Sequence, residues 1–483
     1  MDIHSQTIAP LYIRTADKVF NTLAEGTTNT LSNGGAITSI DDNHIDATLF
    51  SKQDLAINGT GALTITSSSA HGIVCKDDFV MTGGAVSIKS ASQGIDANDS
   101  LRMTGSTQLT IQAGKDGIHV ENSEDASLGF VYISNGQLSV EAQGDGLSAS
   151  AHLQIEDGHF EILAGGGNEN GEQEASETWG NFGGQGENRQ PTTHRDNPSE
   201  RGNAMVKPTV NTLTTTTEES GLSMKGIKAR TGLLINGCSL SIDSADDALH
   251  TNASMYINAG TFELASGDDA LHADESLVIA DGNIHISTSY EGIEGLTVVI
   301  SGGTVDLVAS DDGINAAGGV DTSGSTGGRD GMFGGYPTIS NGNGSVQITG
   351  GTIQVNASGD GIDVNGTLVI SGGTTTVIGP TQGDTATLDY DTSATITGGT
   401  FIGTGASNMA QTFSNASQGV VSVSVGNQTA GTEIRLTDAS GNSIFSFAPA
   451  EAYQVIILSS PELVSGETYT SQIGTQTHTV SAK

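Results

Sequence analysis

A phrase of 21 or 22 residues recurs through residues 266–316, and this repeat constrains the fold more than any other feature of the sequence. Each copy has an acidic turn, a small residue, an apolar residue and a polar residue. Two stretches of alternating apolar residues follow, separated by a Gly-containing turn. Self-similarity at this period indicates a repeat architecture. The apolar residue after the small one, here called the anchor, recurs at Ile45, Ile73, Ile95, Ile118, Leu147, Ile227, Leu249, Leu271, Ile293, Ile314, Ile362 and Leu388.

Each unit contains three short stretches in which apolar and polar residues alternate, rich in Val, Ile, Leu and Thr and bounded by Gly or Asp. A period of two residues predicts strands rather than helices. Three strands in each of about twelve units predict a parallel β-helix, in which each coil lies about 4.8 Å from the previous one. The rule for parallel crossovers makes it right-handed. A β-propeller, the competing fold, needs blades of about 40 residues.

The fold class is therefore all-β, with alternate side chains of each strand in one continuous core. We expect His272 to point outward. The residues expected to be buried are Leu271, Ile279, Ile286, Ile293, Ile300 and Leu307.

The anchors also suggest the domain organisation. We assign residues 1–404 to the β-helix, interrupted by Gly-rich insertions at 165–221 and 318–344. From about residue 405 the repeat stops, and the sequence is typical of antiparallel strands joined by hairpins. Because the ends of a solenoid need cover, residues 405–483 are predicted to form a small β module that caps the helix.

The formal net charge of −38 excludes whole classes of partner. Nucleic acid needs a basic face, so it is excluded, and anionic membrane surfaces are excluded likewise. Dense carboxylates suggest a cation-binding protein or a soluble surface. The sequence has no apolar run of 18 residues, so we expect no membrane insertion, and we expect a monomer. The first residues suggest a strand, and we expect an export leader and a first coil to be missing before them.

The acidic turns would form a column of carboxylates on successive coils. Carboxylates about 5 Å apart repel one another unless a cation neutralises them. Oxygen-only ligands suit Ca²⁺, which is the cofactor we predict. Alternatively, Asp simply favours turns and caps its own backbone, although paired Asp in successive coils is less easily explained in that way. The column contains Asp116, Asp145, Asp246, Asp247, Asp268, Asp269, Glu291, Asp311, Asp312 and Asp360.

The polar residue after each anchor would form a second outward column. It contains Lys228, His250, His272, Glu294 and Asn315, and Asn252 and Asp274 lie two residues beyond the two His. These residues could bind a ligand, support a calcium site or simply be surface polar groups. A zinc site through the two His fits poorly, because the spacing is unsuitable and Cys partners are missing. Our candidate ligand-binding residues are His250, His272, Glu291, Glu294 and Asn315, and our candidate metal ligands are Asp246, Asp247, Asp268, Asp269, Asp274, Asp311 and Asp312.

The sequence has no nucleophile elbow, no defensible Ser/His/Asp order and no phosphate loop. If the protein is an enzyme, the best remaining class is a calcium-dependent polysaccharide lyase, which needs a basic side chain to remove a proton. The candidate bases are Lys52, Lys76, Lys225 and Lys228.

The sequence resembles a family of bacterial carbohydrate-binding proteins in eight phrases that follow in order, KGIKA, SADDALH, SGDDALHAD, SYEGIEG, SDDGINAAGG, GDGIDVNG, LDYD and SSPELVSGETYT. The resemblance implies an exported, calcium-binding, right-handed parallel β-helix of pectate-lyase-like shape that is associated with cellulose and acidic pectic sugars. It also implies calcium ligands at Asp246, Asp247, Asp268, Asp269, Asp311 and Asp312. One departure is Gln53, where the next coil has Asp77.

Three functions follow from this sequence. The favoured one is an extracellular, calcium-dependent protein that binds polysaccharide, either acidic or from plant cell walls. The second is a calcium-dependent polysaccharide lyase, and the third is a structural rod or adhesin at the cell surface.

Overall fold

The computed structural model describes residues 1–38, 45–171, 223–316, 343–380, 383 and 385–483. The described chain is built of strands and turns, with one short 3-10 turn, η1 (Asn168–Asn170). Most of insertion 165–221 and nearly all of insertion 318–344 fall outside the described residues. No helix in the described ranges is long and apolar enough to cross a membrane.

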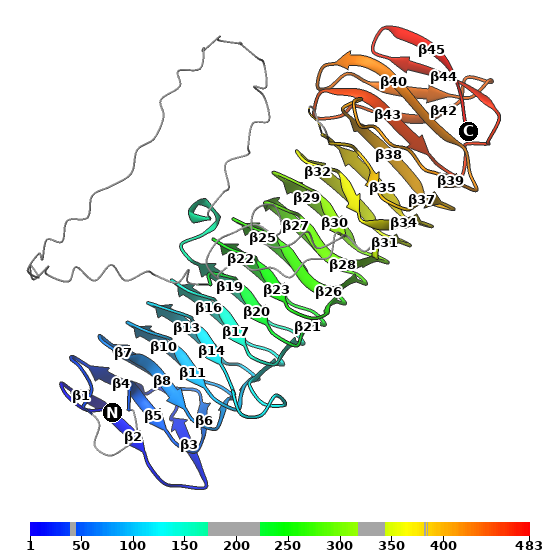
Figure 1. Cartoon of the computed structure of the whole chain (residues 1–483). Helices are drawn as coiled ribbons and strands as arrows, with labels where there is room; N and C mark the ends of the chain where they lie inside the picture. The colour runs from blue at the N-terminus through cyan, green and yellow to red at the C-terminus, as the bar shows by residue number, and fades with distance from the viewer. Residues whose placement is uncertain (39–44, 172–222, 317–342, 381–382, 384) are drawn as a thin grey trace, which may run out of the picture. The chain divides into compact units, whose positions relative to one another are not determined.

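The strands form three parallel ladders, to which each coil contributes one strand apiece (Figure 1). The first ladder consists of β1 (Asp2–Ser5), β4 (Thr28–Asn33), β7 (Ala62–Ser67), β10 (Ala85–Ser90), β13 (Gln108–Ala113), β16 (Gln137–Ala142), β19 (His159–Ala164), β22 (Ser239–Ser244), β25 (Thr261–Ser266), β27 (Asn283–Thr288), β29 (Thr304–Ala309), β32 (Thr352–Ala357), β35 (Thr374–Ile378) and β38 (Thr400–Gly405).

The second ladder carries the anchors. It consists of β2 (Leu11–Ile13), β5 (Ala47–Ser51), β8 (His71–Cys75), β11 (Ile95–Ala97), β14 (Ile118–Val120), β17 (Leu147–Ala149), β20 (Ile227–Ala229), β23 (Leu249–Thr251), the first parts of β26 (Leu271–Ile279) and β28 (Ile293–Ile300), β30 (Ile314–Ala316), β33 (Ile362–Val364) and β36 (Asp389–Tyr390).

The third ladder follows in each coil. It consists of β3 (Lys18–Leu23), β6 (Asp54–Gly59), β9 (Asp78–Met81), β12 (Ser100–Met103), β15 (Phe130–Ile133), β18 (His152–Ile155), β21 (Gly232–Ile235), β24 (Met255–Ile257), the second parts of β26 and β28, β31 (Gly344–Ile348), β34 (Gly366–Ile370), β37 (Ser393–Ile396) and β39 (Asn415–Ala416).

Three parallel strands in each coil confirm the parallel β-helix, whereas its right-handed sense stays a prediction. All six residues that we expected in the core have an exposed fraction of 0%. They stack like on like, since Leu271 pairs with Leu249 on one side and with Ile293 on the other. Each such buried side chain contributes about 1.5–3 kcal/mol to stability.

The first anchor was predicted wrongly. Leu49, not Ile45, pairs with Ile73, and Leu11 pairs with Leu49 in the coil before it. Ile45 instead belongs to a small separate cluster that includes Phe50. The phrase DDNHI imitates an acidic turn followed by an anchor.

The last strands are antiparallel. β43 (Tyr453–Ser459) pairs with β38 and β40 (Val420–Gln428) pairs with β43, so these strands extend the first ladder. A separate antiparallel sheet contains β42 (Ser443–Phe447), β41 (Ile434–Thr437), β44 (Thr468–Ile473) and β45 (Gln476–Ser481). These strands enclose a second apolar core, and the domain boundary near residue 405 stays a prediction.

Candidate functional site

One column of side chains lies two residues before the anchors, on the turns that enter the second ladder. The parallel register stacks the anchors of successive coils, and therefore these positions as well. We call this set the acidic column, although one member is a lysine. It consists of Asp116, Asp145, Lys225, Asp247, Asp269, Glu291, Asp312 and Asp360.

The carboxylates of the acidic column have a structural role. The backbone N–H of Asp145 donates to Oδ1 of Asp116 at 2.9 Å, and that of Asp269 donates to Oδ1 of Asp247 at 3.0 Å. In the same way, the backbone N–H of Asp360 donates to Oδ1 of Asp312 at 2.5 Å. Each such acid thus satisfies a backbone donor of the next coil. The interpretation of Asp as a turn former therefore accounts for one oxygen of each carboxylate, and the second oxygen remains for other partners.

A second column, the polar column, lies one residue after the anchors. It comprises His119, Ser148, Lys228, His250, His272, Glu294, Asn315 and Asp363. In each coil, the members of the two columns are three residues apart, and in three coils an Asp and a His meet across the turn. Nδ1 of His119, His250 and His272 lies 3.2, 2.8 and 3.0 Å from Oδ2 of Asp116, Asp247 and Asp269, respectively. The sequence analysis missed these three pairs, although the repeated D-x-x-H spacing was visible.

Lys225 neutralises the carboxylates beside it. Its Nζ lies 2.7 Å from Oδ1 of Asp246 and 2.7 Å from Oδ2 of Asp247, and its side chain is 1% exposed. Burial would raise the pKa of Asp247, but the Lys225 charge and the His250 hydrogen bond outweigh it and hold the pKa far below its usual range. An ammonium bonded to two carboxylates is poorly suited to be the general base that we considered for Lys225.

His272 lies at the centre of a polar cluster. Its Nδ1 lies 3.0 Å from Asp269 and 2.6 Å from Glu294, and its Nε2 lies 3.1 Å from Asp274. Burial alone would lower its pKa, but hydrogen bonds to these three carboxylates raise the pKa well above its usual value. The raised pKa favours the imidazolium form of His272, which three carboxylates surround.

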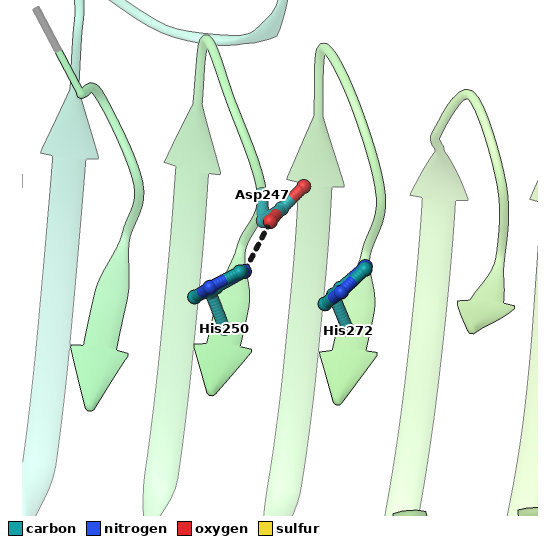
Figure 2. Close-up of side chains that lie close together, drawn as sticks. All are labelled: Asp247, His250 and His272. Carbon is teal, nitrogen blue, oxygen red and sulfur yellow. Dashed lines mark hydrogen bonds and ion pairs between the residues drawn. The ribbon is translucent and has the colours of Figure 1, made fainter. Parts of the chain in front are cut away.

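His272 points away from the apolar core, as predicted, yet its side chain is only 1% exposed. It lies outside the apolar core, yet carboxylates from its own coil and the next coil surround it. Its ring also stacks on that of His250, with the centroids 4.9 Å apart and the planes at 16°. Figure 2 shows these two rings on neighbouring coils, with Asp247 bonded to His250.

From Glu291 onward, the described part of the chain gives the acidic column no cationic partner of this kind. Within the described residues, no Lys or Arg lies within ion-pair distance of Glu291, Asp312, Asp360 or Asp363. Burial and the charges of Asp311 and Asp360 raise the pKa of Asp312 to about 8. Burial likewise raises the pKa of Asp360 to about 7.

Glu291 and Asp363 behave in the same way. Burial and the charge of Glu294 raise the pKa of Glu291 well above its usual value. Burial and the charges of Asp389 and Asp391 raise the pKa of Asp363 to about 6. Buried carboxylates with raised pKa values favour any partner that brings positive charge.

Asn315 provides an independent observation in this region. Its Nδ2 donates to Oε2 of Glu291 at 2.8 Å, and this contact with a carboxylate fixes the orientation of the amide. Its Oδ1 is buried and accepts no hydrogen bond from the residues that the structure describes, and the residue is only 7% exposed. Asn315 stands between Glu294 and Asp363 in the polar column. A buried, unpartnered acceptor among carboxylates suits a bound cation.

The predicted metal ligands fall into separate groups whose ligand atoms lie within 4.8 Å of one another. Asp246, Asp247 and Asp268 form one group, and Asp269 forms another with His272 and Glu294. Asp312 groups with Asp360 and with Asp363, which the sequence analysis did not nominate.

Two predicted ligands lie outside these groups. Asp274 contacts His272, and Asp311 acts on Asp312 through its charge.

A transition-metal site through the two His has a structural obstacle. Asp247, His250 and His272 are close enough together to share an ion. However, the oxygen of Asp247 that faces His250 also bonds the ammonium of Lys225. A second cation there would meet a fixed positive charge. The oxygen donors around Asn315 are better suited to a metal ion, and they are of the kind that Ca²⁺ prefers.

Comparisons with known proteins give the chain its family. A family model described as "Carbohydrate-binding domain-containing protein" matches residues 1–270 and 253–328. A curated protein of the same description from Acetivibrio thermocellus is 32% identical over 168 residues, which are 34% of this chain and 58% of that protein. The chain thus spans less than two thirds of that relative's length.

Among solved structures, the chain is similar to the polysaccharide lyase-like protein from C. thermocellum, solved as a gadolinium derivative. The match has 32% identity and a TM-score of 0.32, and it covers 33% of this chain and 64% of that one. Since the family model matches more than half of the sequence, the protein belongs to the carbohydrate-binding domain-containing protein family.

Proposed function

We propose that the protein binds a polysaccharide outside the cell and that Ca²⁺ supports this binding. The observation that carries the calcium part is the stretch of the two columns around Asn315. There, Glu291, Asp312, Asp360 and Asp363 bring carboxylates with no described Lys or Arg beside them. The buried Oδ1 of Asn315 adds a neutral oxygen donor.

Asp312, Asp360 and Asp363, whose ligand atoms lie within 4.8 Å of one another, would hold the ion, with Glu291 and Asn315 beside them. A bound Ca²⁺ would neutralise the stacked carboxylates and offer a positive charge to the carboxylates of an acidic sugar. The protein's own groups have two tasks. The Oδ1 atoms of the column fix each turn to the next coil, and Asn315 holds Glu291 through its amide. The donors are therefore positioned by the backbone ladder before a cation arrives.

A location outside the cell agrees with calcium binding. Calcium sites of moderate affinity are filled in extracellular surroundings, where the free ion is abundant. An acidic protein also needs a bridging cation before it can approach an acidic polysaccharide closely. Export and an acidic or plant cell-wall ligand are thus parts of the same proposal.

Thermal unfolding tests the calcium part. An ion that binds only the folded state stabilises it by mass action, by about 2.7 kcal/mol at a hundredfold excess over Kd. We expect calcium to raise the unfolding midpoint relative to chelator, and Asp312→Asn to remove most of this shift. Asp116→Asn is the matched control, because Asp116 has the same backbone role but pairs with His119. If calcium shifts the unfolding midpoint equally in both variants, Asp312 is not a calcium ligand.

Retention on insoluble polysaccharide, with calcium and with chelator, tests the binding part. We expect retention without product formation. Polygalacturonate that gains unsaturated ends in the presence of calcium, but not with Lys228→Ala, would instead make the protein a lyase. If the protein is neither retained on polysaccharide nor forms unsaturated ends, with calcium or with chelator, a structural rod or adhesin is the remaining function.

A further inference from the structure

The outward face of the third ladder carries a further column of stacked side chains, part of which is apolar. One outward residue from each coil stacks on the next through the parallel register. We call it the third-ladder column. It consists of Phe20, Ala56, Val80, Arg102, Tyr132, Gln154, Leu234, Tyr256, Val278, Val299, Gln347, Val369 and Thr395.

Four neighbouring members make a continuous apolar surface. Leu234, Tyr256, Val278 and Val299 follow one another from β21 through β24 and β26 to β28, which lie side by side in Figure 1. Tyr256 is at the centre of the surface and is 45% exposed, the largest exposure among the apolar side chains of these coils on this face. An aromatic ring held on a strand and open to solvent has a flat apolar face and a polar hydroxyl.

Neutral polar groups border this surface on both sides. On one side, Nδ2 of Asn258 donates to Oδ1 of Asn236 at 2.7 Å, which places an amide beside each of two coils. On the other side, Ser276 pairs in register with Thr297, and so hydroxyls line the opposite border. An apolar strip between amides and hydroxyls presents both the surface and the hydrogen-bonding groups that a sugar ring uses.

The charge of this column differs from that of the molecule. The protein carries a formal net charge of −38, yet no member of the third-ladder column is an acid. At the borders of the apolar surface, Asn236 bonds the carboxylate of Glu156, and Ser254 bonds that of Glu275. An acidic ligand would be repelled by these carboxylates, and a second copy of this chain would bring the same carboxylates against them. A neutral chain avoids both penalties.

We propose that the strip formed by Leu234, Tyr256, Val278 and Val299 is a docking surface for a neutral polysaccharide chain that runs along successive coils. The coils repeat about every 4.8 Å, a spacing similar to the length of one sugar unit in an extended chain. The inference rests on the proposed function only in taking a polysaccharide as the ligand. Binding at this strip needs no calcium, and the residues of the strip are separate from the acidic and polar columns.

The test is retention of the full chain on insoluble, neutral β-linked glucan, measured in chelator. Tyr256→Ala is expected to weaken retention roughly fivefold to tenfold, since one aromatic contact is worth up to about 1.5 kcal/mol. Val278→Asp, which places a carboxylate on the strip, should weaken it as well. Phe20→Ala is the matched control, because Phe20 is 65% exposed in the same column but distant along the ladder. Unfolding midpoints of all variants establish that they fold.

Retention that falls with Tyr256→Ala but not with Phe20→Ala supports the proposal. An equal fall in both variants indicates non-specific adhesion, and no fall in either places binding elsewhere. A wild-type protein that sediments as a dimer, together with a monomeric Tyr256→Ala variant, would make the strip a contact between copies. Failure to bind neutral glucan overturns this inference alone, because the calcium proposal is judged by the unfolding midpoint and by acidic polysaccharide.

Discussion

Two stretches of the acidic column share one backbone geometry and differ in how their charge is balanced. Between residues 225 and 272, the chain supplies its own cations, the Lys225 ammonium and the His272 imidazolium. Between residues 291 and 363, the donors are carboxylate oxygens and the amide of Asn315. The same ladder therefore makes a polar cluster with cations of its own in one place and a candidate cation site in the other.

This difference shows that stacked acids do not by themselves indicate a metal. The sequence analysis treated Asp247 and Asp312 as equivalent ligands. Asp247 has its pKa held low by Lys225 and His250, although burial opposes this, whereas burial and neighbouring acids raise the pKa of Asp312. The shifts of these two residues differ in sign because Asp247 bonds an ammonium, whereas Asp312 has other acids beside it.

The largest expected effect comes from removing the internal cation. Lys225→Met should destabilise the protein by about 3–5 kcal/mol, since it leaves two buried carboxylates uncompensated. Urea unfolding in chelator measures this change. The matched control is Lys76→Met, whose ammonium lies 3.3 Å from Asp96 and is 46% exposed, and it should change stability by about 1 kcal/mol or less. Equal effects in the two variants would mean that Lys225 does not neutralise the column.

An Asp→Asn substitution should change stability in opposite directions in the two stretches. Asp247→Asn should destabilise the protein by about 2–3 kcal/mol, because it weakens the partnership with Lys225. Asp363→Asn should stabilise the calcium-free protein by about 1–2 kcal/mol, because it removes one of several repelling carboxylates. Unfolding curves of both variants in chelator test the comparison, and a shift of the same sign in both would refute it.

Calcium binding should depend on pH between about 6 and 8. The pKa values of Asp363, Asp360 and Asp312 are raised to about 6, 7 and 8, so these groups hold protons that calcium must displace. Apparent affinity, measured by calorimetric titration, should therefore rise with pH across this window.

In chelator, the stability of the folded protein should fall as pH rises, whereas calcium affinity rises. Raised folded-state pKa values mean that the native state binds more protons than the unfolded chain, so stability should fall as pH rises from about 4 to 8. A calcium affinity that is constant from pH 6 to 8 would show that these carboxylates are not ligands.

The smallest effect is expected before Lys225, at the pair of Asp116 and His119. Burial opposes charge on His119, but Asp116 and Glu121 raise its pKa to about 9. A raised pKa gives stabilisation that is full below about pH 6.5 and is lost as the pH passes 9. His119→Gln should therefore lower stability by roughly 1 kcal/mol at pH 6 and by less at pH 9.5, which thermal unfolding at the two pH values can compare. A loss that is independent of pH would indicate a packing role.

The sequence by itself determined the ladders, because apolar residues with a period of two at a fixed repeat can be buried together only by stacking the coils. It thereby determined the core around Leu271 and the existence of two polar columns beside it. Its prediction failed at Ile45, where a local phrase imitated the repeat and the true register depended on the neighbouring coil.

Only the tertiary structure decided which charges meet. Lys225 lies two residues before the anchor Ile227, but only the structure shows that its ammonium bonds Asp246 and Asp247. Asp312 and Asp360 are far apart in the chain, yet the register places them on adjacent coils beside Asn315. Whether His272 is exposed or buried likewise depends on Glu294 from the next coil. The period of a repeat specifies which residues stack, but charge balance and burial depend on the side chains that adjacent coils bring to each site.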